Sequence, residues 1–358
     1  MVRNKKIKIL YTIPNFNTAG SGKVVYDLVD NLDKSQFAPE ICVFNTEGDL
    51  YKRVESLGVP IHVFNFQTSY KPYFTLLFRV IKISKFFRKH KYDIIHSWHW
   101  NSDWTEVLAA RLSRTKWIYT KKAMTWGNTH WKIKSLLANY IITINDNMYQ
   151  YFPWKKAQEL IPIGIDTNYY NRDLFKNFRN WSKPFHIVTV SNLVPVKNLE
   201  ILIKAISELD HDIKLSIVGD DKTEYADFLK KIVDEFSLKD KVEFLGKKND
   251  VREFLAQADL YVMPSKNEGF GVALVEAMSM ELIVLGSKTN GISFILKDFE
   301  ELLFERDNYL SLKAIIENII NLDSDNRELL QKQLRNVCLK RFSMSVFIES
   351  HQKLYEKL

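Results

Sequence analysis

Short apolar runs and amphipathic stretches alternate along almost the whole chain. In the first half, runs of strand length are separated by segments with apolar residues at helical spacing, as in Lys23 to Leu32 and Trp104 to Leu112. The predicted strands are residues 7–13, 38–44, 60–64, 93–97, 116–120, 140–144 and 158–162. Strands that alternate with helices in this way predict a parallel, doubly wound α/β sheet.

A polar stretch rich in Asn and aromatic residues, Thr167 to Lys183, interrupts the alternation and ends at Pro184, which is typical of a linker. A second series of strands follows at residues 185–190, 213–218, 241–245, 259–263 and 282–285, and the segments 308–322, 325–340 and 344–357 have helical patterns. A chain of 358 residues is long enough for about two domains. We therefore predict a first domain at residues 1–170, a linker at 171–184 and a second domain at 185–340.

Two carboxylates, Glu268 and Glu276, bracket a Gly-Phe-Gly turn in the second half. The preceding Asp259 to Pro264 predicts a buried strand, and the apolar positions from Val272 onward predict a helix. A glycine turn at a helix N-terminus offers free backbone N–H groups and the positive end of the helix dipole, which suit a diphosphate. Glu276, about a turn and a half into that helix, is placed to bind ribose hydroxyls. Taken alone, a helix-capping Glu268 and a solvated Glu276 would be the commoner interpretation.

Other motifs change that balance. The Glu-x7-Glu spacing resembles the signature of the family 4 retaining glycosyltransferases of bacterial surface-polysaccharide type, which have the GT-B fold. Further segments fall in that family's order, so that the resemblance covers nearly the whole chain. They are Lys8 to Ile13, Thr18 to Gly22, Asp93 to Trp98, Ile161 to Asp166, Val190 to Asn198, Ile217 to Asp220, Val242 to Gly246 and Arg341 to Ser343.

The resemblance implies GT-B architecture: two Rossmann-like, doubly wound domains that face a central cleft, with a C-terminal helix at residues 341–358 that crosses back to the first domain. It implies that Lys197 and Glu268 are the catalytic residues. It also implies that Glu276 holds the ribose, that Lys197 and the amides of Val272 and Ala273 hold the diphosphate, and that Glu268 with the amides of Phe270 and Gly271 lies against the donor sugar. The donor-binding residues it implies are Gly20, Gly22, Asn192, Lys197, Gly219, Gly246, Glu268, Phe270, Gly271, Val272, Ala273 and Glu276.

Some positions depart from the family's pattern. The segment Val190 to Asn198 is similar to the loop that binds phosphate in the family. Asn192 stands where that loop commonly has an Arg, which leaves Lys197 as its one clear side-chain cation. Lys121 and Lys122 follow the strand where the family commonly has a histidine. Either lysine supplies the missing charge, or both are surface groups. His96, at a strand end, fits an acceptor-pocket wall or a packed aromatic side chain.

The composition narrows the class of protein. The apolar share of 46% predicts a globular chain. No apolar run approaches the ~18 residues that a membrane span needs. Only Cys42 and Cys338 are present, so we expect no disulfide framework and a reducing cytoplasm. His96 and His99 have no further ligand cluster in the sequence that would predict zinc. We expect no cofactor and no obligatory metal.

Charge is distributed unevenly. Residues 1–180 contain 27 Lys and Arg against 14 Asp and Glu, whereas residues 181–358 contain 24 against 29. The segment Lys71 to Tyr92 has seven cations, no acids and several aromatic residues. This pattern fits a helix on an anionic membrane surface, or equally a packed helix with a solvated basic face. No nucleic-acid-binding motif accompanies the charge, so nucleic acid is not an expected partner.

These observations predict a hexosyl- or N-acetylhexosaminyl-transferase that uses a UDP-sugar or GDP-sugar. The expected acceptor is a saccharide, preferably lipid-linked, in the assembly of a surface polysaccharide such as lipopolysaccharide or capsule. Two alternatives remain open at this point. One is a sugar-nucleotide epimerase of the same architecture, and the other is a catalytically silent protein that binds sugar nucleotide or partners a transferase.

Overall fold

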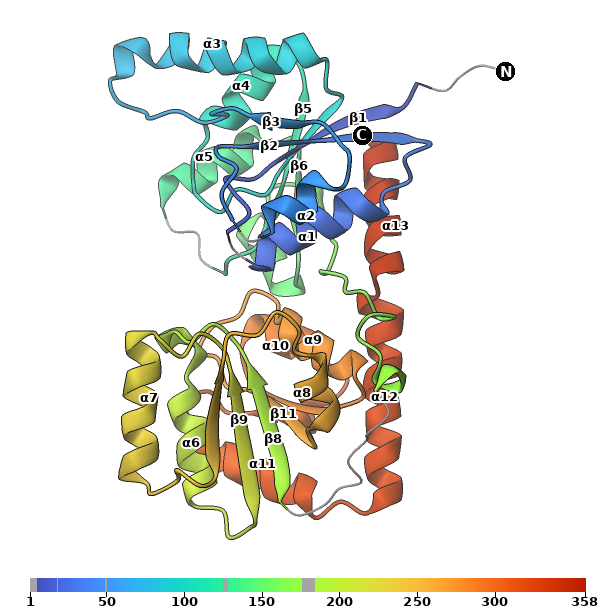
Figure 1. The fold of residues 1–358 in the computed structure, drawn as a ribbon. Helices are drawn as coiled ribbons and strands as arrows, with labels where there is room; N and C mark the ends of the chain where they lie inside the picture. The colour runs from blue at the N-terminus through green and yellow to red at the C-terminus, as the bar shows by residue number, and fades with distance from the viewer. Residues whose placement is uncertain (1–4, 18, 49, 125–127, 176–183) are drawn as a thin grey trace. The chain divides into compact units, whose positions relative to one another are not determined.

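The computed structural model describes residues 5–17, 19–48, 50–124, 128–175 and 184–358 (Figure 1). Its contacts divide the chain into two compact units. The first unit comprises Met1–Gly164 together with Ser345–Leu358, and the second comprises Ile165–Met344. The sequence placed the first boundary at residue 170, six residues later than this division. Residues 176–183 of the predicted linker lie outside the described residues.

The first unit is built on a seven-stranded sheet whose neighbouring strands are all parallel. The strands in spatial order are β3 (Ile61–Val63), β2 (Phe37–Val43), β1 (Ile7–Thr12), β4 (Ile94–Ser97), β5 (Lys116–Lys121), β6 (Tyr140–Thr143) and β7 (Gln158–Leu160). The strand order reverses between β1 and β4, so the loops that follow these two strands diverge at a topological switch point. All seven strands lie where the sequence predicted them.

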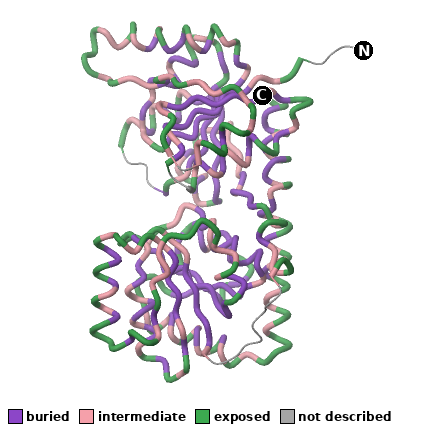
Figure 2. The backbone as a smooth tube through the Cα atoms, in the orientation of Figure 1, coloured by how far each residue is buried: buried purple, intermediate pink, exposed green. Residues whose placement is uncertain are grey.

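Helices cover both faces of this sheet, since a parallel sheet must bury each face. They are α1 (Ala19–Asn31), α2 (Tyr51–Glu55), α3 (Tyr73–His90), α4 (Thr105–Ser113), α5 (Thr129–Leu137) and α13 (Met344–Lys357). Figure 2 shows the strands as the most buried part of the unit. The C-terminal helix α13 belongs here because its buried Tyr355 meets the sheet: the Tyr11 hydroxyl lies 3.1 Å from that of Tyr355.

The second unit has a six-stranded parallel sheet. In spatial order its strands are β10 (Val242–Gly246), β9 (Ile213–Val218), β8 (Phe185–Val190), β11 (Leu260–Met263), β12 (Ile283–Ser287) and β13 (Leu303–Phe304). The switch point lies between β8 and β11. The sequence predicted these strands except β13, whose two residues are too short for a recognisable pattern.

In the described part of the second unit, five helices lie between these strands in the chain and two come after the last strand. They are α6 (Leu199–Ser207), α7 (Glu224–Glu235), α8 (Arg252–Gln257), α9 (Val272–Ser279), α10 (Asn290–Ile295), α11 (Tyr309–Ile320) and α12 (Ser324–Phe342). Beyond α12, Ser343 pairs with Ile165: the Ile165 N–H donates to the Phe342 carbonyl at 2.9 Å, and the Met344 N–H donates to the Ile165 carbonyl at 2.8 Å. The unit therefore begins and ends at one backbone pairing.

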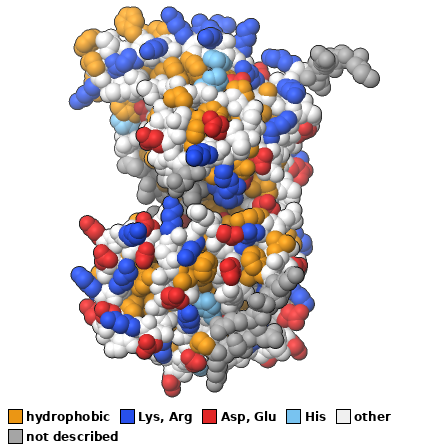
Figure 3. Space-filling model, in the orientation of Figure 1, with side chains coloured by type: hydrophobic (Ala, Val, Ile, Leu, Met, Phe, Trp, Pro, Cys, Tyr) orange, Lys and Arg blue, Asp and Glu red, His pale blue; other side chains and the backbone are white. Residues whose placement is uncertain are grey.

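Helix α3 has two distinct ends. Toward its C-terminus, Val80, Ile83 and Phe87 are buried in the core of the first unit. Its N-terminal half instead exposes large apolar side chains: Tyr73 is 69% exposed, Phe74 82%, Leu77 58% and Phe78 74%. Figure 3 shows hydrophobic side chains together with Lys and Arg over this helix. The residues Tyr73, Phe74, Leu77 and Phe78 are called the α3 apolar patch below.

Substitutions at a buried and at an exposed position of α3 should differ in their effect on the free energy of unfolding. Ile83→Ala leaves a cavity in a packed core and should destabilise the first unit by about 2–5 kcal/mol. Leu77→Ala removes an exposed side chain and should change stability by less than about 0.5 kcal/mol. Urea unfolding followed by circular dichroism measures both. Equal midpoints for the two variants would contradict this packing of α3.

Candidate active site

The loops after β8 and β11 meet at the switch point of the second unit. The loop after β8 contains the short 3-10 turn Pro195–Lys197, and the Lys266 N–H of the loop after β11 donates to the Val196 carbonyl at 2.8 Å. This bond holds the two loops together and lets the Lys197 ammonium form an ion pair with the Glu268 carboxylate. Both side chains remain partly accessible, at 21% and 15% exposure. The structure thus brings together the two residues predicted as catalytic.

Glu268 is held from two further directions. The buried Ser265 hydroxyl donates to Glu268 Oε1 at 3.1 Å. The Gly291 N–H, at the start of α10, donates to the Glu268 backbone carbonyl at 3.1 Å. The sequence did not predict these two positioning residues. Ser265 follows the strand by two residues, and Asn290-Gly291 opens a helix, so the positions were visible but their contacts were not.

Glu276 lies in α9 and is 9% exposed. The pKa of Tyr170 is well above its ordinary value. Burial is the main cause, and the Glu276 carboxylate, to which Tyr170 donates a hydrogen bond, raises this pKa further. Burial followed by the charges of Glu276 and Glu268 does the same for the pKa of Tyr261. The charges of both glutamates therefore act on the same side chain, that of Tyr261 in β11.

Backbone geometry at two glycines shapes this region. Gly271 caps the N-terminus of α9 with φ of 115°, a conformation that residues with a Cβ rarely adopt. At Gly219, a Cβ would lie 2.2 Å from the Ser191 carbonyl oxygen, so the loop after β8 approaches too closely for any side chain. The Gly219 N–H donates to the Gly246 carbonyl at 3.2 Å. These predicted positions therefore hold the loops after β8, β9 and β10 together.

The remaining predicted donor residues lie beside these loops. Val272 and Ala273 form the first turn of α9, where amides have no carbonyl within the helix to bind. The Phe270 ring is buried and contacts Phe342 at 5.6 Å between centroids, so it anchors the turn while its backbone stays at the loop. Asn192 is exposed, and its carbonyl accepts a hydrogen bond from the Val194 N–H at 3.0 Å.

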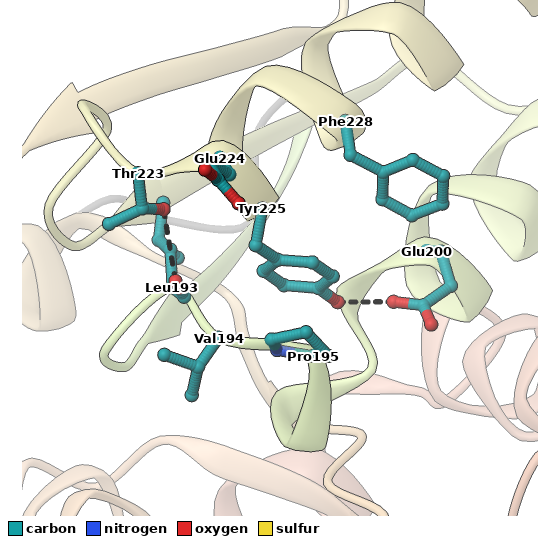
Figure 4. A pocket seen from close by; sticks show the side chains of 8 residues that line it. All are labelled: Leu193, Val194, Pro195, Glu200, Thr223, Glu224, Tyr225 and Phe228. Atoms are coloured by element: carbon teal, nitrogen blue, oxygen red, sulfur yellow. Dashed lines mark hydrogen bonds between the residues drawn. The ribbon is translucent and has the colours of Figure 1, made fainter.

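A pocket of about 520 Å³ lies next to the loop after β8, between α6 and α7 (Figure 4). It is lined by Leu193, Val194, Pro195, Glu200, Thr223, Glu224, Tyr225 and Phe228. The Tyr225 hydroxyl donates to Glu200, and the Thr223 hydroxyl donates to the Leu193 carbonyl at 3.0 Å. None of the predicted site residues lines this pocket.

The first glycine segment differs from its predicted form. Gly20 and Gly22 lie in the first turn of α1, whereas the helical pattern of the sequence began only at Lys23. A Cβ at Gly20 would meet nothing within 4 Å, but at Gly22 it would lie 3.2 Å from the Phe16 ring. Open space beside Gly20 leaves room for a ligand, and close packing explains Gly22.

Of the two interpretations that the sequence left open for His96, the structure agrees with the packed aromatic side chain. It is fully buried in β4, where Nδ1 lies 2.7 Å from the Tyr355 hydroxyl and Nε2 lies 2.8 Å from the Thr120 hydroxyl. Burial, together with the charges of His351 and Lys122, lowers the pKa of His96 well below its ordinary value. Both ring nitrogens are used inside the first unit, so His96 is a packing residue and not part of an acceptor-pocket wall.

Lys121, the last residue of β5, and Lys122, which follows it, are not exposed surface groups. Lys121 is fully buried, and its ammonium lies 4.4 Å from the centre of the Trp131 ring. Burial lowers the pKa of Lys121 to about 8. Lys122 is half-buried and donates to the Ser21 hydroxyl at 3.0 Å and to the Trp98 carbonyl at 2.5 Å.

Sequence reasoning missed a buried polar network behind these lysines. Glu106 of α4 is fully buried and accepts hydrogen bonds from Thr12 at 2.6 Å and Ser97 at 2.9 Å, at the ends of β1 and β4. Lys134 of α5 is also fully buried, and its ammonium donates to the Asn101 carbonyl at 3.0 Å. Burial lowers the pKa of Lys134 to about 8, while Glu106 and Asp103 act in the opposite direction. Lone charged residues within helical patterns carry no signal that they point inward.

One ligand-like cluster lies elsewhere in the first unit. Glu40, His62 and His90 bring potential metal-binding atoms within 4.8 Å of one another, a grouping that the sequence did not predict. The Glu40 carboxylate, however, already binds the Lys8 ammonium at 2.8 Å and the Tyr92 hydroxyl at 2.8 Å. The cluster is therefore explained as a charge-balanced network at the edge of the sheet.

Comparison with known proteins places the chain in a family. Residues 18–169 match the family model described as Glycosyltransferase Family 4, and residues 171–337 match the model described as Glycosyl transferases group 1. Together the two matches span most of the chain. The chain belongs to the family 4 glycosyltransferases, as its motifs predicted.

Relatives and solved structures agree with this assignment. An uncharacterized glycosyltransferase of Methanocaldococcus jannaschii is 33% identical over 175 residues, and the match spans 47% of each protein, about half the length of that relative. CapH, a capsular polysaccharide biosynthesis glycosyltransferase of Staphylococcus aureus, is 24% identical over 84% of this chain and 86% of its own length. HepE of Anabaena, solved with UDP, has a TM-score of 0.84 at 20% identity and covers 98% of this chain and 100% of that one. The predicted GT-B fold is confirmed.

Glycine substitutions test the loop geometry. Gly219→Ala places a Cβ against the Ser191 carbonyl and should destabilise the second unit by about 1–3 kcal/mol. Gly20→Ala adds a methyl group in open space within a helix and should leave stability unchanged or raise it by up to about 1 kcal/mol. Thermal unfolding of both variants measures the difference. Wild-type stability in Gly219→Ala would contradict the close approach of these loops.

Proposed function

We propose that this protein is a retaining glycosyltransferase that transfers a hexose or an N-acetylhexosamine from a nucleoside-diphosphate sugar to a saccharide. The observation that carries the proposal is the convergence of Lys197, Glu268 and Glu276 at the switch point between β8 and β11. Ligands of doubly wound folds bind outside the carboxyl ends of the strands at such a point. The structural neighbour HepE was solved with UDP and with UDP-glucose, which supports a nucleotide-sugar donor.

In this proposal each group of the site has a distinct role. Glu276 accepts the two ribose hydroxyl hydrogens. Lys197 and the first-turn amides of α9 bind the diphosphate, because an ammonium and unpaired N–H groups at a helix N-terminus both favour an anion. Glu268 and the amides of Phe270 and Gly271 contact the donor sugar.

The Lys197–Glu268 ion pair has a consequence for donor binding. Lys197 neutralises Glu268 in the structure, so an arriving diphosphate competes with a carboxylate for the same ammonium. When the diphosphate takes Lys197, the Glu268 carboxylate is released toward the donor sugar while Ser265 still donates to it. Its charge then stabilises the positive character that develops at the anomeric carbon.

The proposed chemistry is a front-face displacement. The bond from the anomeric carbon to the phosphate oxygen breaks, and its electron pair goes to the departing nucleoside diphosphate. The acceptor oxygen bonds to the anomeric carbon on the same face, and the leaving phosphate oxygen takes the acceptor proton. Preorganised amides and Lys197 meet the charge of the leaving group in this scheme, so no metal is obligatory.

We also propose that the acceptor is a saccharide of surface polysaccharide synthesis, carried on a lipid at the inner face of the cytoplasmic membrane. CapH and an O-antigen biosynthesis glycosyltransferase of Escherichia coli are similar over most of this chain, which supports the polysaccharide class. Within the described residues, no helix is long and apolar enough to cross a membrane. The α3 apolar patch lies beside exposed Lys82, Lys85, Arg88 and Lys89, a combination suited to an anionic bilayer surface.

The two glutamates should respond differently to substitution. Glu276→Ala should weaken UDP binding about 10- to 100-fold, because it removes charge-assisted hydrogen bonds of about 1.5–3 kcal/mol. Glu268→Ala should lower turnover far more than UDP affinity. Calorimetry with UDP and release of nucleoside diphosphate from UDP-sugars and GDP-sugars measure the two effects.

Glu243→Gln is a suitable control, because Glu243 pairs with Lys214 at an exposed position on β10. The proposal expects equal turnover with and without EDTA. Wild-type UDP affinity and turnover in Glu276→Ala would remove the assignment of the site. An epimerase would instead convert the sugar nucleotide without releasing nucleoside diphosphate.

Membrane association should be reversible and should depend on both parts of α3. Each Lys or Arg near an anionic surface contributes about 1 kcal/mol, and this attraction decays within a Debye length. Changing Lys82, Lys85, Arg88 and Lys89 to Gln should abolish sedimentation with anionic liposomes at low salt. The double substitution Phe74→Ser and Phe78→Ser should weaken the part of liposome binding that persists at high salt. No preference of the wild type for anionic over neutral vesicles would sink this proposal.

A further inference from the structure

Lys122 is a cation without an acidic partner among the described residues. It directly follows β5, and its ammonium donates to the Ser21 hydroxyl of α1 and to the Trp98 carbonyl after β4. Its other contacts are with the rings of Trp98 and Trp100, at 5.4 and 5.9 Å from their centres. Neutral oxygens and indole faces compensate for only part of the lost hydration of an ammonium.

The charges that face Lys122 do not supply the missing anion. Lys121 precedes it on β5, and Lys134 of α5 acts on Lys122 as a like charge. His96 of β4 and His99 after it are neutral, because burial lowers the pKa of both, that of His99 to about 3. The buried acids of the region, Glu106 and Asp103, act on Lys134. In α1, Lys23 is paired with Asp27 at 2.7 Å.

The surroundings of Lys122 also offer a surface for a sugar ring. Trp100 is 47% exposed, and an exposed indole presents a flat apolar face. A Cβ at Gly20, next to Ser21, would meet no atom within 4 Å. The ammonium, a hydroxyl, an indole face and open space therefore lie at the start of α1 and in the loops after β4 and β5, next to the switch point between β1 and β4.

We propose that Lys122, Ser21 and Trp100 form an anion site in the first unit that binds a phosphate or carboxylate group carried by a sugar substrate. This inference rests on the proposed function, since it names a further substrate group that the transferase recognises. Lys122 donates to the anion, Ser21 turns its hydroxyl toward it, and Trp100 stacks on the attached ring. The anion has two possible sources, an acidic saccharide acceptor or the diphosphate of the donor.

The ionisation of Lys122 gives the site a pH dependence. Burial, and then Lys134, lower the pKa of Lys122 to about 7. A bound anion stabilises the charged ammonium, so anion affinity is full at pH values below this pKa and falls as the pH rises through it. A lysine with only a packing role would not produce this profile.

Ligand binding to the full chain tests the site. We would measure saturation-transfer NMR with methyl glucuronide, glucose 1-phosphate and UDP, using methyl glucoside as the neutral control, between pH 6 and 9. Lys122→Met keeps the length and apolar stem of the side chain and should weaken anion binding by about tenfold or more. Trp100→Ala should weaken binding of methyl glucuronide and glucose 1-phosphate, because it removes the indole face on which their rings stack. Lys132→Met, at an exposed position on α5, is the matched control and should bind like wild type.

The ligands separate the two sources and the two proposals. Loss of methyl glucuronide or glucose 1-phosphate binding in Lys122→Met assigns the anion to an acidic acceptor, and loss of UDP binding alone assigns it to the donor. Equal affinity of wild type and Lys122→Met for all three anions, with unchanged circular dichroism, would overturn the site. That failure is distinct from failure of the proposed function, because UDP binding that depends on Glu276 would persist.

Discussion

Both faces of a parallel sheet must be covered, and this requirement determines where the helices and the candidate site residues of this protein lie. Every crossover from one strand to the next must place a helix against the sheet, so the helices leave only the carboxyl edge of each sheet for chemistry. Where the strand order reverses, at β1 and β4 in the first unit and at β8 and β11 in the second, neighbouring loops diverge and their backbone groups stay available. The candidate functional residues gather at these two points.

The charged side chains at the two switch points differ in their burial and in their partners. In the second unit, Lys197 and Glu268 form a partly exposed ion pair, and Glu276 on α9 is buried and accepts a hydrogen bond from Tyr170. In the first unit, Lys134 and Glu106 are buried without direct contact with water, and hydrogen bonds from Thr12 and Ser97 satisfy the carboxylate. Burial of such groups is costly unless partners are present, which explains why the network is extensive.

Helix α3 shows how one element serves two environments. Its buried residues join the aromatic core of the first unit, whereas Phe74 and Phe78 are exposed without covering the core. An apolar cluster of this kind at a protein surface marks an interaction site more often than an accident of packing. The cations along the same helix favour an anionic surface over a neutral protein partner.

The sequence by itself determined the strands, the long helices and the donor-side motifs, because hydrophobic periodicity and glycine turns are local signals. It predicted Lys197, Glu268 and Glu276 as site residues, and the structure pairs Lys197 with Glu268 across 71 positions of the chain. Only the tertiary structure decided which residues face inward and what they meet. His96 became a packing residue through Tyr355, 259 positions away in the chain. Lys122 met Ser21 across 101 positions, a contact that no local pattern encodes.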